Sequence, residues 1–300
     1  MLVGNEGEDK LKIIDPEQKP QETKRSQMSE DTPTNTDGSE PGTSLSPPGV
    51  HHTLPSSAER RITAHVPTNG GLVNPAAEIG VVAREAGVLY LLDACQFIGQ
   101  VPIDVGTIGC DMLSATGRKY LRGPRGTGFL YVRREILEDL EPPFLDLHAA
   151  EWSGKGSFEI RPDARRFENW EANFAGKVGL SVAVDYALGW GIEGIWERVR
   201  TLADDLRSRL DELPGVEVRD LGAERCGIVT FNVDGHAAGD VSRRLSGEGI
   251  NTSVSAASST LLDMQDRNLD ALVRASVHYY NTEEEISRFC ETLERFTSRV

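Results

Sequence analysis

Asp93 is the first residue whose type and place could do chemistry, because it follows the apolar run Val88–Leu92 and precedes Gln96. Such a run is typical of a strand that is buried on both faces. Ligands of α/β sheets bind at the carboxyl ends of strands, so an ionised Asp93 could hold a cationic group there. The alternative is a structural carboxylate that caps a helix or forms a strand-end turn.

The segment Ser114–Gly128 gathers hydroxyl groups, glycines and cations, among them Thr116, Arg118 and Lys119. Backbone N–H groups of a glycine-rich loop and the forks of arginine side chains can both bind a phosphate. A solvated basic loop is the competing interpretation, because a glycine-rich loop is a weak signal by itself.

A third stretch, Arg274–Glu285, begins with an arginine on a predicted strand. An arginine in that position can bind a substrate carboxylate through two parallel hydrogen bonds. It can equally form a structural salt bridge, and the residue alone leaves both interpretations open.

The elements that must position these stretches form an α/β layer. Asn74 as N-cap and Pro75 at the first helical position are typical of a helix start, and Gly87 of its end. The order of strand, helix and glycine-rich loop predicts a mainly parallel sheet. Its strands are expected at 88–92, 112–115 and 129–132, with a turn or short helix at 103–108.

The second half of the chain has the pattern of a small α+β domain whose sheet is covered by helices on one side. Gly189 and Gly191 separate two predicted helices, and Thr282 and Glu285 fit a capping box. The expected helices are 173–188, 192–213, 237–248 and 282–296, and the expected strands are 216–219, 227–233, 250–254 and 272–277. We therefore expect a large domain at 61–185 and a small domain at 186–300.

Residues 1–60 have a different composition. They contain no Phe, Tyr, Trp or Cys, and the first aromatic residue of the chain is Tyr90. Such a segment cannot bury enough apolar surface to offset the entropy lost on ordering. The composition predicts a disordered, low-complexity N-terminal tail.

Composition and charge exclude several classes of function. The net charge of −15 disfavours binding to nucleic acid and to anionic membranes. No apolar run approaches the roughly 20 residues of a membrane span. The four cysteines are widely spaced without a CxxC pair, which predicts reduced thiols in a cytoplasmic protein and no metal site.

Taken together, the motifs resemble the class V aminotransferase and cysteine desulfurase-like family of pyridoxal 5′-phosphate (PLP) enzymes, which have fold type I. The Asp-x-x-Gln unit, the lysine after a small-Gly-basic run, and the Arg-x-Ser-x-x-x-Tyr-Asn-Thr-x-Glu-Glu block occur in family order. The resemblance runs from about Arg61 to the C-terminus. It implies a partial fold type I large domain, without the N-terminal part that relatives have, followed by the small domain.

The resemblance implies a role for each matching position. Lys119 would hold PLP as a Schiff base and later move the α-proton of an amino-acid substrate. Asp93 would pair with the pyridine nitrogen of the cofactor, and Gln96 would bond to its phenolic oxygen.

The remaining positions would hold the phosphate and the substrate. Thr116 and Arg118 would bind the phosphate, where relatives often carry Ser and His. Asn69 would lie near the cofactor, and Arg274 would bind the α-carboxylate. The stretch Arg166–Asn173 resembles a family segment whose Gly-Thr contacts the partner subunit of a homodimer, but this chain has Trp-Glu there.

Desulfurases of this family carry a nucleophilic cysteine on a loop ahead of the C-terminal arginine block, and the region Ser255–Met264 contains none. The sequence therefore predicts transamination, epimerisation or C–S lysis and not cysteine-persulfide chemistry. The closer likeness is to isopenicillin N epimerase-like proteins and ergothioneine-pathway C–S lyases. The alternative hypothesis is a truncated, inactive relative that acts as a binding module or as half of a split enzyme.

Overall fold

The structure is a computed structural model that describes residues 60–297. The disorder predicted for residues 1–60 therefore falls outside the described residues, apart from Arg60. Among those described, no helix is long and apolar enough to cross a membrane.

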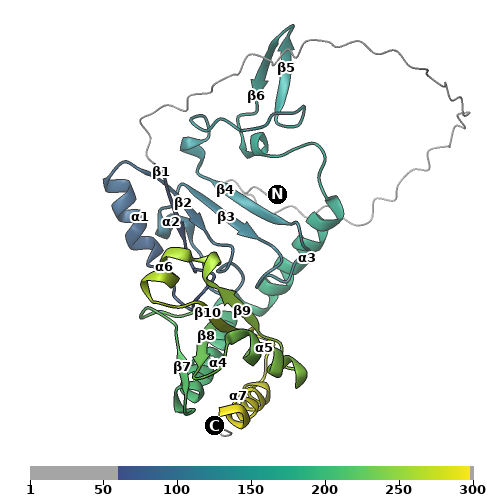
Figure 1. Cartoon of the computed structure of the whole chain (residues 1–300). Helices are drawn as coiled ribbons and strands as arrows, with labels where there is room; N and C mark the ends of the chain where they lie inside the picture. The colour runs from purple at the N-terminus through teal and green to yellow at the C-terminus, as the bar shows by residue number, and fades with distance from the viewer. Residues whose placement is uncertain (1–59, 298–300) are drawn as a thin grey trace, which may run out of the picture. The chain divides into compact units, whose positions relative to one another are not determined.

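The first sheet has four strands in the order β1-β2-β3-β4 (Figure 1). The first three are parallel and the fourth is antiparallel. A helix or helical turn connects each parallel pair, as parallel strands require. The elements are β1 (Arg60–Ala64), α1 (Ala76–Glu85), β2 (Leu89–Asp93), α2 (Val105–Ile108), β3 (Met112–Thr116) and β4 (Gly128–Val132).

Buried and half-buried side chains alternate along β2 and β3, and the buried ones form the core of this layer. Tyr90 and Leu92 of β2 are fully buried, and so is Leu113 of β3. The other face of β2 is only half-buried. The expectation that this strand is buried on both faces is therefore correct for one face and wrong for the other, which is only half-buried.

Helix α1 starts differently from the prediction. The side chain of Asn74 does not cap the helix but donates to the carbonyl oxygen of Ala64 at 2.7 Å. Asn74 therefore ties the helix start to the end of β1. The predicted end is confirmed, because Gly87 follows the helix with a φ of 65°.

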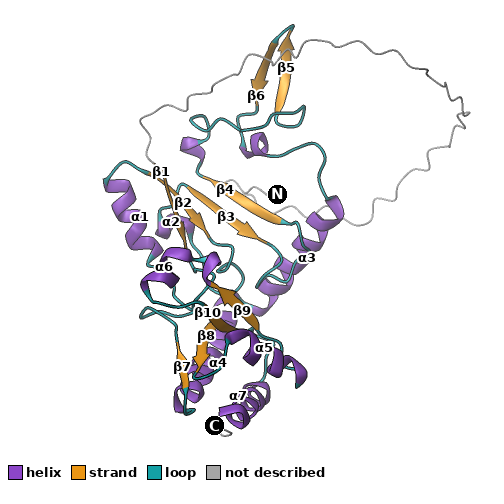
Figure 2. Ribbon diagram, in the orientation of Figure 1, coloured by secondary structure: helices purple, strands orange, loops and turns teal. Residues whose placement is uncertain are grey.

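The second sheet is antiparallel, in the order β7-β8-β10-β9 (Figure 2). One face of β8 carries Val229, Phe231 and Val233. These side chains share a hydrophobic core with the helices α4, α5 and α7, whose bounds are given below. The predicted capping box forms, since Glu285 N donates to Thr282 Oγ1 and Thr282 N donates to Glu285 Oε2. The elements are α4 (Ile192–Glu212), β7 (Val216–Val218), β8 (Ile228–Val233), α5 (Ala238–Gly247), β9 (Ser253–Ala256), β10 (Ala271–Ser276) and α7 (Glu283–Thr297).

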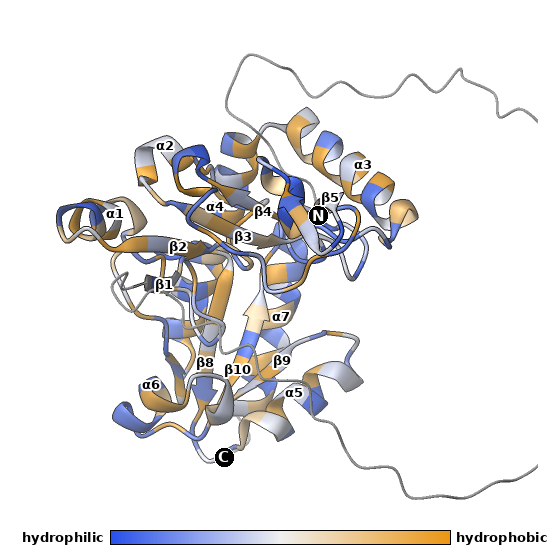
Figure 3. Ribbon diagram, turned by 90° about the horizontal axis from the view of Figure 1, so that it is seen from above, coloured by the Kyte–Doolittle hydropathy of each residue, from blue (hydrophilic) through white to orange (hydrophobic). Residues whose placement is uncertain are grey.

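Helix α3 (Phe174–Trp190) joins the two sheets and ends at Gly191, whose φ is 81°. Apolar residues occur along the length of this helix (Figure 3). Five exposed, largely apolar residues are spaced four apart along the helix, so they lie on one face. These residues are Phe174, Val178, Val182, Tyr186 and Trp190. We call them the α3 row.

Several short elements have no counterpart in the sequence analysis. The hairpin of β5 (Ala150–Gly154) and β6 (Ser157–Ile160) projects away from the first sheet (Figure 1). Its residues are mostly exposed on both faces, so no alternation of burial marks them. Strand β1 and the short helix α6 (Leu261–Asp266) were also not predicted.

Candidate functional site

Asp93 lies at the carboxyl edge of the first sheet, where the predicted site residues meet. It pairs in register with Ser114 of the neighbouring parallel strand. Its Oδ1 accepts a hydrogen bond of 2.9 Å from the backbone N–H of Cys95. The strand-end turn considered above therefore exists, and it fixes the carboxylate at the edge where ligands of α/β sheets bind.

Lys119 is held in a turn that directly follows β3. Gly117 N donates to Thr127 O at 2.9 Å, and Gly123 N donates to Gly117 O at 2.7 Å. Arg122 closes the turn in the left-handed region, with a φ of 61°. Within residues 60–297 the amine of Lys119 has no hydrogen-bond or ion-pair partner.

The surroundings of Lys119 favour the neutral amine. Burial, the largest effect, lowers the pKa of Lys119, and the positive charges of Arg118 and Arg274 lower it further, against the opposing effects of Cys95 and Asp93. A lowered pKa increases the fraction of nucleophilic amine at neutral pH. Four predicted residues are thus close enough to interact electrostatically.

Cys95 is a residue of the site that the sequence analysis did not identify. Its thiol contacts the Asp93 carboxylate and the Ser114 side chain, and it interacts with Lys119. Burial and then Asp93 raise the pKa of Cys95 to about 11, so the thiol is protonated at neutral pH. The other three cysteines are buried, and all four are free.

The loop between β1 and α1 contains Asn69 and contacts Gln96, which follows β2. The buried Gln96 donates from Nε2 to Thr68 Oγ1 of this loop at 3.3 Å. The buried Asn69 donates from Nδ2 to Ala256 O and to Thr260 Oγ1, while its Oδ1 has no partner among residues 60–297.

Arg274 reaches the same loop from β10 of the second sheet. Its Nη1 donates to Thr68 O at 3.1 Å and its Nε to Ser276 Oγ at 3.1 Å. Within residues 60–297 it forms no ion pair, so the salt-bridge interpretation does not apply there. Burial lowers the pKa of Arg274. A half-buried guanidinium without a carboxylate partner is suited to binding a carboxylate ligand.

Thr116 and Arg118 flank the Lys119 turn but bind little within the protein. Thr116 Oγ1 is 3.5 Å from Thr127 O, a long contact for a hydroxyl donor. The Arg118 side chain is exposed. Both groups therefore stay available to an external acceptor.

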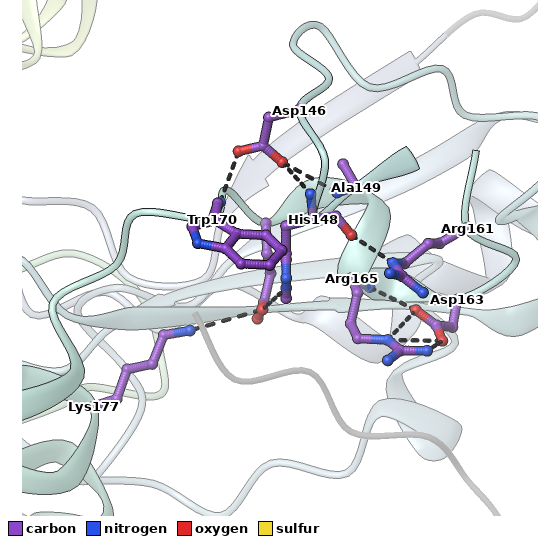
Figure 4. Close-up of polar contacts among 9 residues, drawn as sticks. Asp146, His148, Ala149, Arg161, Asp163, Arg165, Trp170 and Lys177 are labelled. Carbon is purple, nitrogen blue, oxygen red and sulfur yellow. Dashed lines mark hydrogen bonds and ion pairs between the residues drawn. The ribbon is translucent and has the colours of Figure 1, made fainter. Parts of the chain in front are cut away.

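The segment Arg166–Asn173 makes polar contacts with the residues that precede β5 and with α3, and Figure 4 shows Trp170 of this segment near Asp146 and His148. Glu168 contacts His148 at 3.3 Å and Lys177 at 3.7 Å, and Asp146 accepts from Trp170 N at 2.7 Å. Residues of this segment also line a cavity of about 310 Å³ together with Thr127 and Lys177. The side chains of Trp170 and Glu171 are exposed.

Comparison with known proteins gives the family. Residues 53–289 match the aminotransferase class-V family, and this chain belongs to it. A probable cysteine desulfurase of Methanothermobacter thermautotrophicus is 32% identical over 77% of this chain and 58% of the relative. A probable cysteine desulfurase of Xylella fastidiosa is 33% identical over 84% of this chain and 60% of the relative.

Solved structures confirm the predicted fold type I architecture. The apo cysteine desulfurase of Thermococcus onnurineus NA1 superimposes with a TM-score of 0.77 and 28% identity, covering 81% of this chain and 61% of that one. The cystine C–S lyase C-DES, solved with its product cysteine persulfide, gives a TM-score of 0.69 and 26% identity, covering 79% and 60%. A C-DES variant carries glycine covalently linked to its PLP cofactor.

Two facts follow from these matches. The chain spans about three fifths of the length of the relatives it matches. The exclusion of desulfurase chemistry is wrong, because the matched relatives are named cysteine desulfurases. The missing cysteine at Ser255–Met264 concerns one loop, whereas the match covers the layer that carries the site.

Proposed function

We propose that this chain is a PLP-dependent enzyme of the cysteine desulfurase kind, which removes sulfur from L-cysteine. The observation that carries the proposal is the partly buried, unpartnered amine of Lys119 beside Asp93 and Arg274. The names of the matched relatives support the choice of a sulfur-containing amino acid as substrate.

The residues present fit PLP as cofactor, as the family and the PLP-linked relative indicate. The buried Asn69 Oδ1 lacks a partner, and so does the Lys119 amine within the described chain. A phosphate, an aromatic ring nitrogen and an aldehyde match this set of cations, carboxylate and amine. The holding residues would be Lys119, Asp93, Gln96, Asn69, Thr116 and Arg118.

When bound, PLP supplies an electron sink that weakens bonds to the substrate's α-carbon. The side chains of the protein would bind the cofactor and the substrate and would move the proton. Asp93 would accept a hydrogen bond from a protonated ring nitrogen and hold the proton there. The Lys119 amine, whose pKa burial lowers, would take the proton from the α-carbon, and Arg274 would orient the substrate through its carboxylate.

The test uses the purified chain with PLP, L-cysteine and a small thiol as external sulfur acceptor. We expect a visible absorption band on addition of PLP, and one alanine for each cysteine consumed. The thiol takes the sulfur as a persulfide, and a second thiol reduces this persulfide to sulfide and becomes oxidised to a disulfide, so sulfide should equal alanine when the thiol is in excess. Lys119→Ala should abolish the band and the products. Lys155→Ala, in the exposed turn of the hairpin, is the control and should retain both. Absence of the band at saturating PLP would refute the proposal.

We further propose a homodimer in the cytoplasm. The α3 row offers an apolar face along one helix, and burying it against a second copy would remove it from water. The free cysteines support a reducing compartment.

A further inference from the structure

The loop Thr68–Gly71 is the segment in which contacts from both sheets converge. Thr68 O accepts from Arg274, and Thr68 Oγ1 accepts from Gln96. The next residue, Asn69, is bonded to Ala256 and Thr260. Any displacement of this loop would therefore move a cofactor contact and a substrate contact together.

Gly71 anchors the loop through hydrogen bonds in a tightly packed environment. Its N–H donates to Asp220 Oδ1 at 3.3 Å, and its carbonyl accepts from Cys226 N at 2.7 Å. A Cβ atom at this position would lie 2.5 Å from Ile228 O and 2.6 Å from Arg207 Nη2. Only glycine fits without a shift of the backbone.

This tight environment is formed by a buried ion pair between α4 and the segment that connects β7 to β8. The side chains of Asp220 and Arg207 are 0% and 3% exposed, and Arg207 Nε donates to Asp220 Oδ2 at 2.8 Å. Asp220 Oδ1 also accepts from the N–H and the hydroxyl of Thr230. Arg207 Nη2 donates to the carbonyls of Cys226 and Ile228.

Such a pair is stable only while its charges stay matched and hydrogen-bonded. Both side chains meet this condition here, and one carboxylate oxygen is directed to the loop through Gly71. Neither residue contacts Lys119, so an effect on the site must pass through the loop.

We infer that Asp220, held by Arg207, is a positioning residue that fixes Gly71 and through it Thr68 and Asn69. The expected effect on catalysis rests on the proposed function, whereas the expected effect on the position of the loop does not. A pair that only stabilised β8 would leave the loop and the site unchanged when Asp220 is altered.

The first experiment measures amide hydrogen exchange in the protein without cofactor. Gly71→Ala and Asp220→Asn should speed exchange at residues 68–73 by about tenfold or more, with strand β3 unchanged. Gly70→Ala is the matched control, because nothing lies within 4 Å of a Cβ there. Asp111→Asn is the second control, since it weakens an Asp–Arg pair that supports β2 instead.

The second experiment uses the PLP-loaded protein. Gly71→Ala and Asp220→Asn should raise KM for L-cysteine about tenfold with a smaller change in kcat, while both controls stay near wild type. Unchanged loop exchange in both variants, or altered exchange with an unaltered KM, would overturn the inference. If Asp220→Asn does not fold, Gly71→Ala decides alone, because it retains both charged residues while its Cβ, which would lie 2.9 Å from Asp220 Oδ2, displaces the loop from them.

The two proposals fail differently. A wild-type protein that captures no PLP would refute the proposed function, while hydrogen exchange would still report whether Asp220 holds the loop.

Discussion

The hydroxyl of Tyr120 donates a hydrogen bond of 3.0 Å to the carbonyl oxygen of Val277. The residue after Lys119 is thereby bonded to the chain three residues beyond Arg274. His278 Nε2 lies 3.2 Å from Tyr120 O, and the two rings stack with centroids 5.0 Å apart. The turn that carries Lys119 is therefore fixed to the segment that follows β10, the strand that carries Arg274, although neither contact was predicted.

Tyr120→Phe should lower the free energy of unfolding by about 1 to 2 kcal/mol, because it removes a buried hydrogen bond and leaves Val277 O without that donor. Urea unfolding measures the loss. Tyr280→Phe is the control, since Tyr280 is 61% exposed. Equal losses in the two variants would contradict a special role for the Tyr120 hydroxyl.

Arg274→Gln should raise KM for an amino-acid substrate roughly 10- to 100-fold, the loss expected for a charge-assisted bond to a carboxylate. Steady-state kinetics of the PLP-loaded protein test this. Arg243→Gln is the matched control, because the Arg243 side chain is 77% exposed and pairs only with a residue of its own helix. An equal KM in the two variants would exclude Arg274 as the carboxylate ligand.

Stability should fall between about pH 6.5 and pH 4, in part because of His278. Burial lowers the pKa of His278 from 6.5 to about 4. The unfolded chain binds a proton in this range that the folded chain does not, so stability is complete above 6.5 and is lost as the pH falls. The full contribution is on the order of 3 kcal/mol.

His278→Phe keeps an aromatic ring against Tyr120 but cannot bind the proton. The slope of unfolding free energy against pH in this range should be shallower in the variant than in the wild type. An unchanged slope would mean that His278 does not contribute. His65, which burial also brings to a pKa of about 4, remains in both proteins as a constant background.

The family resemblance predicted that Asp93 and Lys119 share one site, and the fold explains why, because Asp93 ends β2, Lys119 follows β3, and the carboxyl ends of these parallel strands share an edge. Arg274 was found only through its motif, since it comes from the second sheet. The division at 185/186 stays a prediction.

Contacts between distant segments were beyond sequence reasoning. Gly71 and Asp220 are 149 residues apart, and nothing local marks either as a partner of the other. Asn74 has the residue type of a cap, yet the carbonyl of Ala64 competes successfully for its side chain. The hairpin was missed because its strands have little burial to impose an alternating pattern.

Val178→Asp should convert the proposed homodimer into monomer. Val178 lies within the α3 row and is 66% exposed, so a carboxylate there would have to lose its water on dimerisation. Sedimentation equilibrium measures the change, which we expect as at least a tenfold rise in the dimer dissociation constant. Val82→Asp is the matched control, because Val82 is 64% exposed on α1, outside the row. A dimer that survives Val178→Asp, or that Val82→Asp weakens equally, would mean that the α3 row is not the interface.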